Sequence, residues 1–166
     1  EVDVPIRDDW FYTPTNESTL KSVDKLMEIW FSSVGRGSNL ILNVTPDRRG
    51  LLPYADSVRL MEFKAARDAY FAKPVASCRN KSGKAVLKVK EPVKCIVLQE
   101  DIKYGQKIKS FTVEALEGDA WRQIASGTTV GHKRILQFDA PVDASRIRVT
   151  VTDSFAKPML KSVTLY

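Results

Sequence analysis

The chain has 166 residues and a net charge of +6, from 26 lysines and arginines against 20 aspartates and glutamates. Its hydrophobic fraction of 43% and charged fraction of 28% exclude the disordered and collagen-like classes. No apolar run approaches the roughly 18 residues that a membrane-spanning helix needs. The length fits one ordinary domain or two small ones.

The excess of positive charge is not gathered on one arm of the sequence. The densest basic run, Lys81–Lys94, alternates with apolar residues, as the exposed edge of a strand does. A nucleic-acid-binding protein usually clusters its lysines and arginines on one face or segment. We therefore expect neither a nucleic acid nor a membrane as partner.

Cysteine and histidine are scarce, with Cys78, Cys95 and His132 as the only examples. No Cys-x-x-Cys or His-x-x-x-His spacing occurs, so we expect no metal site and no cofactor. The two cysteines could form a disulfide if their strands are neighbours and the chain is exported. Two buried thiols would fit the sequence equally well.

The first residues, Glu1–Pro5, are neither a methionine start nor a signal peptide, which suggests a fragment. Residues 20–34 then repeat apolar side chains at helical spacing, which predicts an amphipathic helix. Asn16 or Ser18 is expected to cap its first turn, and Gly35 to supply the left-handed residue at its end.

A strongly apolar segment, Asn39–Val44, follows and predicts a strand buried on both faces in a parallel sheet. Residues 45–50 form a loop, and a second helix is expected over Tyr54–Ala69. Helix–strand–helix is a slice of an α/β architecture. This chain alone cannot cover both faces of the strand, so further strands must come from elsewhere. The expected buried side chains of the second helix are Val58, Met61, Ala65, Ala66 and Ala69, with Leu60 and Phe63 as further candidates for the same side.

The pattern changes near Lys73–Pro74 from helical spacing to short alternating strands with glycine-containing turns at residues 104–106, 117–119 and 126–127. Several short strands at such spacing indicate a β-sandwich or jelly roll. The expected strands are Cys95–Gln99, Ile108–Ala115, Trp121–Ala125, Arg134–Phe138, Ile147–Thr152 and Leu160–Leu165.

Three segments in order resemble glycoside hydrolase family 29: Ile6–Tyr12 (IRDDWFY), Ser33–Val44 (SVGRGSNLILNV) and Pro46–Gly50 (PDRRG). The resemblance implies an α/β plus all-β chain. Residues 1–73 would be the last part of a (β/α)8-type catalytic barrel, and residues 74–166 a β-sandwich. Segments such as Ile96–Ile102 and Arg146–Val149 make that sandwich similar to discoidin-like, galactose-binding-like domains.

This resemblance implies a retaining α-L-fucosidase that hydrolyses terminal α-linked fucose from fucosylated oligosaccharides, in the subgroup acting on α-1,3/4 linkages. Retention requires two carboxyl groups roughly 5 Å apart. In the family the nucleophile precedes the region seen here, so we expect no catalytic residue in this chain and no activity without the upstream barrel. The resemblance further implies a periplasmic or secreted protein. The alternative function is a non-catalytic carbohydrate-binding or structural β-sandwich module.

The resemblance assigns substrate binding to Trp10, Glu1 and Arg7. An aromatic at Trp10 would pack against the C5 methyl of fucose, whereas Phe11 is expected in the core. Glu1 could accept hydrogen bonds from sugar hydroxyls, or act as the acid/base. Arg7 could bind two hydroxyls with its planar donors. The alternative for Glu1 and Arg7 is a salt bridge, formed between Arg7 and either Glu1 or Asp3.

Other polar and aromatic residues favour structural interpretations. Asn43 is expected to cap loop backbone, and Arg48 or Arg49 to tie the 45–50 loop to a carboxylate. Trp121 and His132 could form a sugar-stacking platform on the sandwich. We expect instead that Trp121 lies in the core and that His132 is an exposed loop residue.

Overall fold

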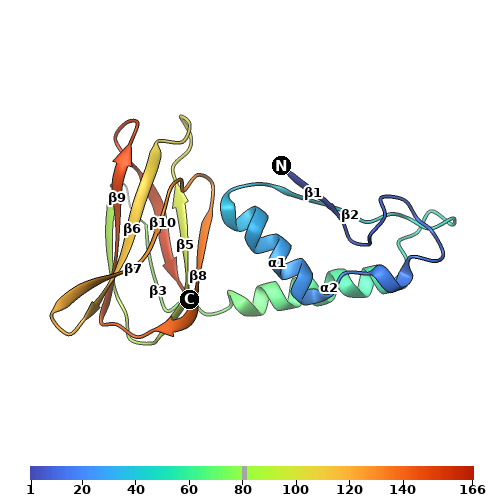
Figure 1. The fold of residues 1–166 in the computed structure, drawn as a ribbon, viewed down its shortest axis with the longest axis horizontal. Coiled ribbons are helices and arrows are strands. Elements are labelled where there is room, and N and C mark those ends of the chain that lie inside the picture. Colours follow the sequence, from blue (N-terminus) through green and yellow to red (C-terminus); the bar gives the residue numbers. More distant parts are fainter. Residues whose placement is uncertain (80–81) are drawn as a thin grey trace. The chain divides into compact units, whose positions relative to one another are not determined.

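The computed structural model describes residues 1–79 and 82–166, which fall into two compact units (Figure 1). The N-terminal unit comprises Glu1–Val34 and Ser38–Ala72, and the C-terminal unit comprises Gly35–Gly37 and Lys73–Tyr166. Lys81, the first residue of the basic run, lies outside the described residues. The assignment of residues 1–73 to a barrel and of residues 74–166 to a named sandwich class stays a prediction.

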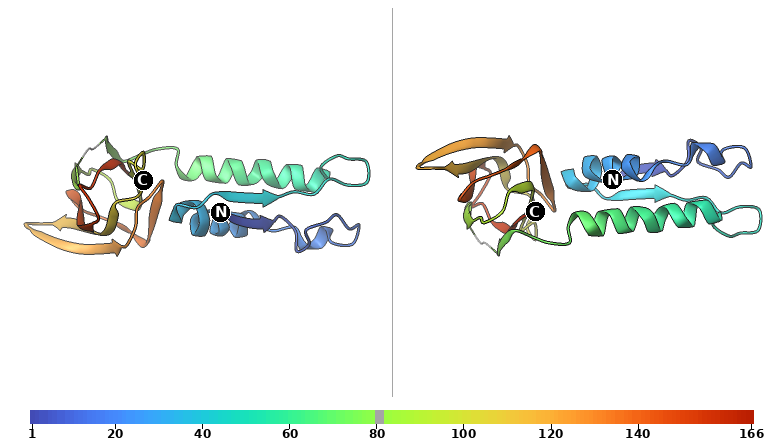
Figure 2. Two further views of the ribbon diagram at one scale, coloured as in Figure 1. Left: turned by 90° about the horizontal axis from the view of Figure 1, so that it is seen from above. Right: turned by 90° about the horizontal axis from the view of Figure 1, so that it is seen from below.

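The N-terminal unit pairs two parallel strands with two helices (Figure 2). Val2 lies opposite Leu40 in the strand pair, and Pro5 lies opposite Asn43. Its apolar core contains Leu26 and Phe63, one from each helix. The elements are β1 (Val2–Pro5), η1 (Glu17–Thr19), α1 (Val23–Ser33), η2 (Val34–Arg36), β2 (Leu40–Asn43) and α2 (Tyr54–Tyr70). The parallel pairing of the 39–44 strand is confirmed, whereas β1 was not predicted.

The first helix begins later than the sequence suggests. Its N-cap is Ser22, whose Oγ accepts a hydrogen bond from the backbone N–H of Lys25 at 3.1 Å. The prediction of Asn16 or Ser18 as cap was wrong, because residues 17–19 form a separate 3-10 turn. Gly35 lies in a second 3-10 turn, and the left-handed residue is Gly37, with φ of 89°. Glycine suits that position because it carries no Cβ.

The second helix is confirmed, and so are Leu60 and Phe63 on its buried side, but most of the other residues predicted for that side were wrong. Val58 and Met61 are exposed, with 36% and 64% of their surface accessible. The buried residues of α2 are Asp56 and Phe63, and Leu60 packs against the same core. Asp56 is buried because it pairs with Arg7, which lies outside the helix. This pairing determines which face of α2 turns toward the core.

The C-terminal unit is a β-sandwich of two four-stranded antiparallel sheets (Figure 1). The strand orders are β3-β10-β5-β8 and β4-β9-β6-β7. The strands are β3 (Ala76–Arg79), β4 (Lys84–Lys88), β5 (Val93–Glu100), β6 (Ile108–Glu117), β7 (Ala120–Gly127), β8 (Arg134–Val142), β9 (Arg146–Ser154) and β10 (Leu160–Leu165). Alternate residues of both sheets fill the core, such as Val113 and Val149 from one sheet and Leu98 and Val163 from the other.

All six predicted strands of the sandwich are confirmed in position: Leu160–Leu165 has the predicted ends, and the other five strands are longer by one to four residues at one or both ends. The basic run contains the edge strand β4, in which Lys84 and Lys88 are exposed while Ala85 and Leu87 are buried. Lysines at a sheet edge discourage pairing with another chain. The short strand β3 was not predicted.

Two of the predicted turns hold left-handed glycines, Gly105 with φ of 84° and Gly118 with φ of 60°. The turn predicted at residues 126–127 was wrong, because Gly127 ends strand β7. A Cβ at Gly127 would lie 2.5 Å from Cζ of the buried Phe111 ring. Gly127 is therefore needed for close packing against Phe111 and not for a turn. The sequence pattern does not distinguish these two roles of glycine.

The two cysteines lie on strands that are not neighbours. Cys78 is on β3 and Cys95 on β5, and β10 runs between these strands. Both residues belong to the described part of the chain, and they form no disulfide with each other. Burial raises the pKa of the Cys78 thiol.

Candidate functional site

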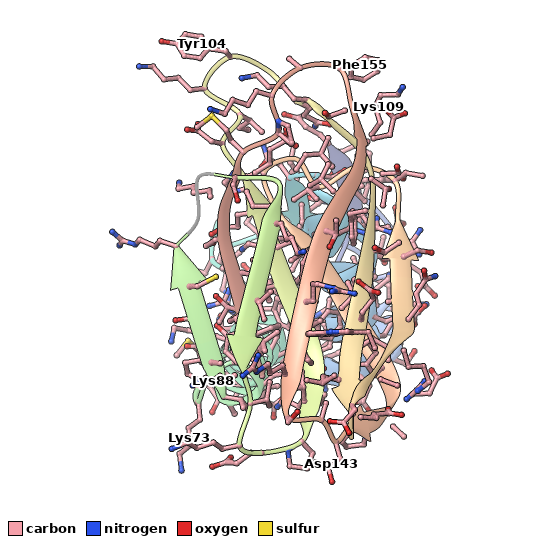
Figure 3. The ribbon with its side chains drawn as sticks, turned by 90° about the vertical axis from the view of Figure 1, so that its left-hand side faces the viewer. Lys73, Lys88, Tyr104, Lys109, Asp143 and Phe155 are labelled. Carbon is pink, nitrogen blue, oxygen red and sulfur yellow. The ribbon has the colours of Figure 1, made fainter. Side chains whose placement is uncertain are left out.

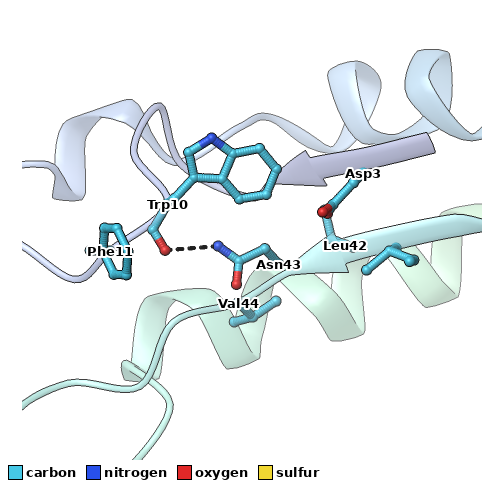
Figure 4. A pocket seen from close by; sticks show the side chains of 7 residues that line it. Asp3, Trp10, Phe11, Leu42, Asn43 and Val44 are labelled. Atoms are coloured by element: carbon cyan, nitrogen blue, oxygen red, sulfur yellow. Dashed lines mark hydrogen bonds between the residues drawn. The ribbon is translucent and has the colours of Figure 1, made fainter. Parts of the chain in front are cut away.

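An open pocket of about 660 Å³ lies at the C-terminal ends of the two parallel strands (Figure 4). Its polar side chains are Asp3 and Asn43, and the remaining lining is aromatic and aliphatic. The lining residues are Asp3, Trp10, Phe11, Ile41, Leu42, Asn43 and Val44. Loops that follow the carboxyl ends of parallel strands are where α/β proteins place ligands.

The pocket lies on the face of the strand pair that its helices leave open. Asp3 and Ile41 are partners in the register, and both are exposed, Ile41 by 45%. The alternate side chains of the strands, such as Leu42, point to the other face and pack against the apolar core with the helices. The prediction that this chain cannot cover both faces of the Asn39–Val44 strand is therefore confirmed. The alternation in β1 was the signal that could have identified Asp3.

Trp10 lines the pocket, and its backbone is fixed by two hydrogen bonds. The Trp10 carbonyl oxygen accepts from Asn43 Nδ2 at 2.9 Å and from Thr45 Oγ1 at 2.9 Å (Figure 4). These bonds tie the segment after β1 to the segment after β2. The indole is 46% exposed. The expectation that Asn43 caps loop backbone is confirmed.

Phe11 does not lie in the core, so that expectation was wrong. Its side chain is 77% exposed and lines the pocket beside Trp10. Residues 6–11 form bends and not a strand, so alternation does not send Trp10 and Phe11 to opposite sides, and the core of this unit is filled by Ile6, Leu26 and Phe63.

Arg7 is buried, with 6% of its surface accessible, and its donors are engaged inside the N-terminal unit. Nη2 lies 2.6 Å and Nε 3.0 Å from Asp56 Oδ1, while Nη1 donates to Asn16 Oδ1 at 3.0 Å. The hydrogen bond to Asp56 raises the pKa of the guanidinium. The salt bridge considered for Arg7 therefore forms with Asp56 and not with Glu1 or Asp3. Glu1 is exposed and directly precedes β1.

The 45–50 loop is closed on itself by Asp47. Asp47 Oδ1 accepts from the backbone N–H of Arg49 at 2.8 Å, and Asp47 Oδ2 lies 2.6 Å from Arg49 Nη2. The hydrogen bond from the Arg49 side chain holds the pKa of Asp47 below its usual value. The expected structural role of this arginine is confirmed.

On the sandwich, the expectation for Trp121 was wrong and that for His132 is confirmed. Trp121 is only partly buried, and the Arg148 guanidinium carbon lies 4.1 Å from the centroid of its ring. Arg148 Nε and Nη2 each donate at 2.7 Å to the two oxygens of Glu114. Trp121 on β7, Glu114 on β6 and Arg148 on β9 therefore form a row of contacting side chains across the sheet. His132 is exposed.

Residues 1–79 and 82–166 offer neither a metal site nor a membrane-spanning helix. No three His, Cys, Asp or Glu side chains gather there in a way that could hold a metal ion. Among the same residues, no helix has both the length and the apolar character needed to cross a membrane.

Comparisons with known proteins find the same arrangement, a helix-backed pair of parallel strands followed by a β-sandwich, within larger glycoside hydrolases. Residues 1–65 match the family model described as Alpha-L-fucosidase. The chain is 28% identical to Alpha-L-fucosidase 1 of Arabidopsis thaliana, over 100% of its own length and 40% of that protein's length. The chain thus spans about two fifths of the curated relatives it matches.

Two crystal structures share the fold of this chain and about a third of its residues. One, from Bacteroides thetaiotaomicron and named a "putative alpha-L-fucosidase", has a TM-score of 0.92 and 34% identity, covering 98% of this chain and 39% of its own. The other, a glycoside hydrolase 29 family member from an unknown rumen bacterium, has a TM-score of 0.85 and 33% identity, covering 98% and 31%. The chain is thus similar to α-L-fucosidases, and to a member of glycoside hydrolase family 29, over the part of their length that it covers.

Proposed function

We propose that the chain is the C-terminal part of a retaining α-L-fucosidase, in which the N-terminal unit completes a (β/α)8-type catalytic barrel. The observation that carries this proposal is the open face of β1 and β2. Helices cover one face, whereas Asp3 and Ile41 on the other are exposed. A barrel strand needs helices outside and packed side chains inside, so the open face is the one that further strands would close.

The pocket supplies one wall of the proposed fucose site. In this arrangement the Trp10 indole packs against the C5 methyl of the sugar, and Phe11 extends the apolar surface. Asp3 stands in the same pocket and can accept hydrogen bonds from sugar hydroxyls. Trp10 is suited to this task because its backbone is held by Asn43 and Thr45 while its ring stays accessible.

Glu1 and Arg7 complete the proposed substrate-binding set in different ways. Glu1 is exposed just before β1 and is not among the pocket's lining residues, so in this proposal it binds a hydroxyl of the substrate from outside the pocket. Arg7 acts chiefly by position, because its donors already bind Asp56 and Asn16. It holds the segment that leads to Trp10 in place.

The chemistry of hydrolysis belongs to residues outside this chain in the proposal. A retaining glycosidase needs a nucleophilic carboxylate and an acid/base carboxyl about 5 Å apart. The pocket has one carboxylate among its lining residues, Asp3. The nucleophile therefore comes from the upstream barrel, which is the partner of this chain. The substrates are fucosylated oligosaccharides with α-1,3/4 linkages, and the enzyme works in the periplasm or outside the cell.

The test is to express the chain together with the residues that precede it in its parent protein and to assay cleavage of an aryl α-L-fucoside. We expect hydrolysis with net retention, which proton NMR of the first-formed fucose anomer detects. Residues 1–166 alone are the matched control and should be inactive. A folded parent protein that leaves α-L-fucosides intact, or that inverts the anomeric centre, would contradict the proposal.

A further inference from the structure

Two aromatic side chains project from one end of the sandwich. Tyr104 lies in the loop between β5 and β6, and Phe155 lies in the loop between β9 and β10; each is 78% exposed. Figure 3 shows both at the same end of the unit, opposite Lys88 and Asp143. Ile102, 38% exposed, adds apolar surface to the first loop. Exposed large apolar groups that gather in one place mark interaction surfaces.

Lysines surround these two rings. Lys103 Nζ lies 5.2 Å and Lys107 Nζ 6.0 Å from the Tyr104 ring centroid, and Lys109 Nζ lies 5.1 Å from the Phe155 ring centroid. Such distances place the ammonium groups within range of a cation–π attraction. We define the Tyr104–Phe155 patch as Ile102, Lys103, Tyr104, Lys107, Lys109 and Phe155.

The loops that carry the patch are fastened to each other and to the sandwich. The Phe155 N–H donates to the Lys107 carbonyl oxygen at 2.8 Å, and the Asp101 N–H donates to the Met159 carbonyl oxygen at 2.9 Å. The buried carboxylate of Glu100 accepts from the Lys107 N–H at 2.6 Å. The rings are therefore exposed on a fixed support, which lowers the entropy cost of binding a ligand.

We propose that the Tyr104–Phe155 patch binds an acidic glycan, a polysaccharide whose sugars carry carboxylate or sulfate groups. The apolar C–H face of a pyranose would stack on an exposed ring, and a neighbouring ammonium would pair with the acidic group of the same or the next sugar. The combination of ring and cation, each within one sugar's width of the other, selects for this chemistry over a neutral chain.

A lipid surface fits these observations less well. The patch offers three apolar side chains, which is little area for insertion into a bilayer. Asp153, whose Oδ2 lies 2.5 Å from Lys109 Nζ beside the patch, lowers its positive charge toward a membrane and an acidic glycan alike, so the small apolar area is the argument against a membrane. The inference concerns the sandwich alone and does not depend on the fucosidase proposal.

Residues 1–166 can be titrated by calorimetry with polygalacturonate and with chondroitin sulfate, using dextran as the neutral control polymer. We expect heat of binding with at least one acidic polymer and none with dextran. The affinity should fall as salt is raised, because the lysines are exposed to solvent. Absence of binding to both acidic polymers would overturn the proposal, as would equal binding to dextran.

Variants separate stacking from general charge attraction. The double change Tyr104→Ala with Phe155→Ala should weaken binding by about tenfold or more, and Lys103→Gln with Lys107→Gln should do the same and flatten the salt dependence. The matched controls are Tyr54→Ala, at an aromatic 83% exposed on α2, and Lys88→Gln with Lys90→Gln, at exposed lysines. Both controls should bind as the parent does, and thermal melting should show all variants folded.

Three outcomes would overturn the assignment to this patch. Binding unchanged by the loss of both rings would leave only charge attraction. An equal loss in the Lys88 and Lys90 variant would show that any lysines suffice. Stronger binding to vesicles of phosphatidylserine and phosphatidylcholine than to either acidic polymer would assign the patch to membranes instead.

Discussion

Arg7 and Asp56, 49 positions apart in the sequence, form a buried ion pair in which Arg7 Nη2 lies 2.6 Å from Asp56 Oδ1. Their side chains are 7% and 1% exposed. The pair joins the segment between β1 and Trp10 to the first turn of α2. It therefore positions the backbone of the candidate pocket and fixes which face of the helix meets the core.

Removing one member of this pair should destabilise the N-terminal unit. Asp56→Ala would leave the Arg7 guanidinium buried without its partner, a change that costs about 3–5 kcal/mol. Thermal or urea unfolding of residues 1–166 measures the loss. Asp68→Ala is the matched control on the same helix, because its partners Lys64 and Arg67 form ion pairs exposed to solvent.

Replacing both members by apolar residues of similar size separates two contributions to stability. One is the penalty of leaving Arg7 buried without a partner, and the other is the net stabilisation by the ion pair. Arg7→Met with Asp56→Leu should be clearly more stable than Asp56→Ala alone. A double variant as unstable as the single one would mean that the hydrogen-bond geometry, including Asn16 on Arg7, is what the unit requires.

Trp10 and Phe11 make a matched pair for testing the pocket in the parent protein. Trp10→Ala should weaken fucose binding by about tenfold or more while leaving the melting temperature almost unchanged, because the ring is 46% exposed. Phe11→Ala, at a neighbour 77% exposed, should affect binding less. Calorimetry and melting curves report the two effects separately. Equal losses of binding and stability in Trp10→Ala would assign the indole to the fold instead of the sugar.

Local patterns in the sequence predicted most of the sandwich and much less of the pocket. Residues 111–115 alternate apolar and polar side chains, and that alternation is the direct mark of a strand with one face buried. β3, four residues long, carries too short a pattern and is defined by its pairing with β10. Pairing of that kind depends on residues about 85 positions away.

The errors on α2 and at Phe11 have a common physical origin. The helix has apolar residues on more than one side, so spacing alone could not choose between Val58 and Phe63 as the buried position. The choice depends on the ion pair with Arg7, which no local pattern contains. Phe11 was assigned to the core because three consecutive aromatics cannot all face one way, yet the core was already filled by residues distant in sequence. Asp3 could have been found from alternation in β1 together with the neighbouring strand.

The pair of Glu114 and Arg148 should give the sandwich a stability that depends on pH. The hydrogen bond from Arg148 holds the pKa of Glu114 below its usual value, so the pair stabilises the fold when Glu114 is ionised. This contribution is present above the unfolded glutamate pKa of about 4.3 and is lost as pH falls through the lower, folded value. Unfolding free energies of the parent and of Glu114→Gln should therefore differ near neutral pH and converge in acid.

Glu91→Gln is the control for that comparison, because Glu91 is an exposed glutamate outside the strands. Its unfolding curve should follow the parent at every pH. If Glu114→Gln differed from the parent by the same amount at acidic and neutral pH, the stacking of Arg148 on Trp121, and not the charge of Glu114, would be the stabilising feature.

Glu100 should be the residue that holds the end of the sandwich together. Its buried carboxylate accepts from the backbone N–H groups of Lys107, Ile108 and Gly131, at 2.6, 3.0 and 3.2 Å. Glu100→Gln would replace one acceptor oxygen with an amide NH₂ that faces N–H donors. The expected cost is about 1–3 kcal/mol, since at least one buried donor loses its acceptor.

Hydrogen exchange locates this cost more sharply than global unfolding does. In Glu100→Gln, the amides of Lys107, Ile108 and Gly131 should exchange faster, whereas those of Val113 and Val149 in the core should change only with global stability. Uniformly faster exchange across all strands would mean that Glu100 supports the whole sandwich. Faster exchange confined to the three amides would instead mean that Glu100 fixes the loop that presents Tyr104.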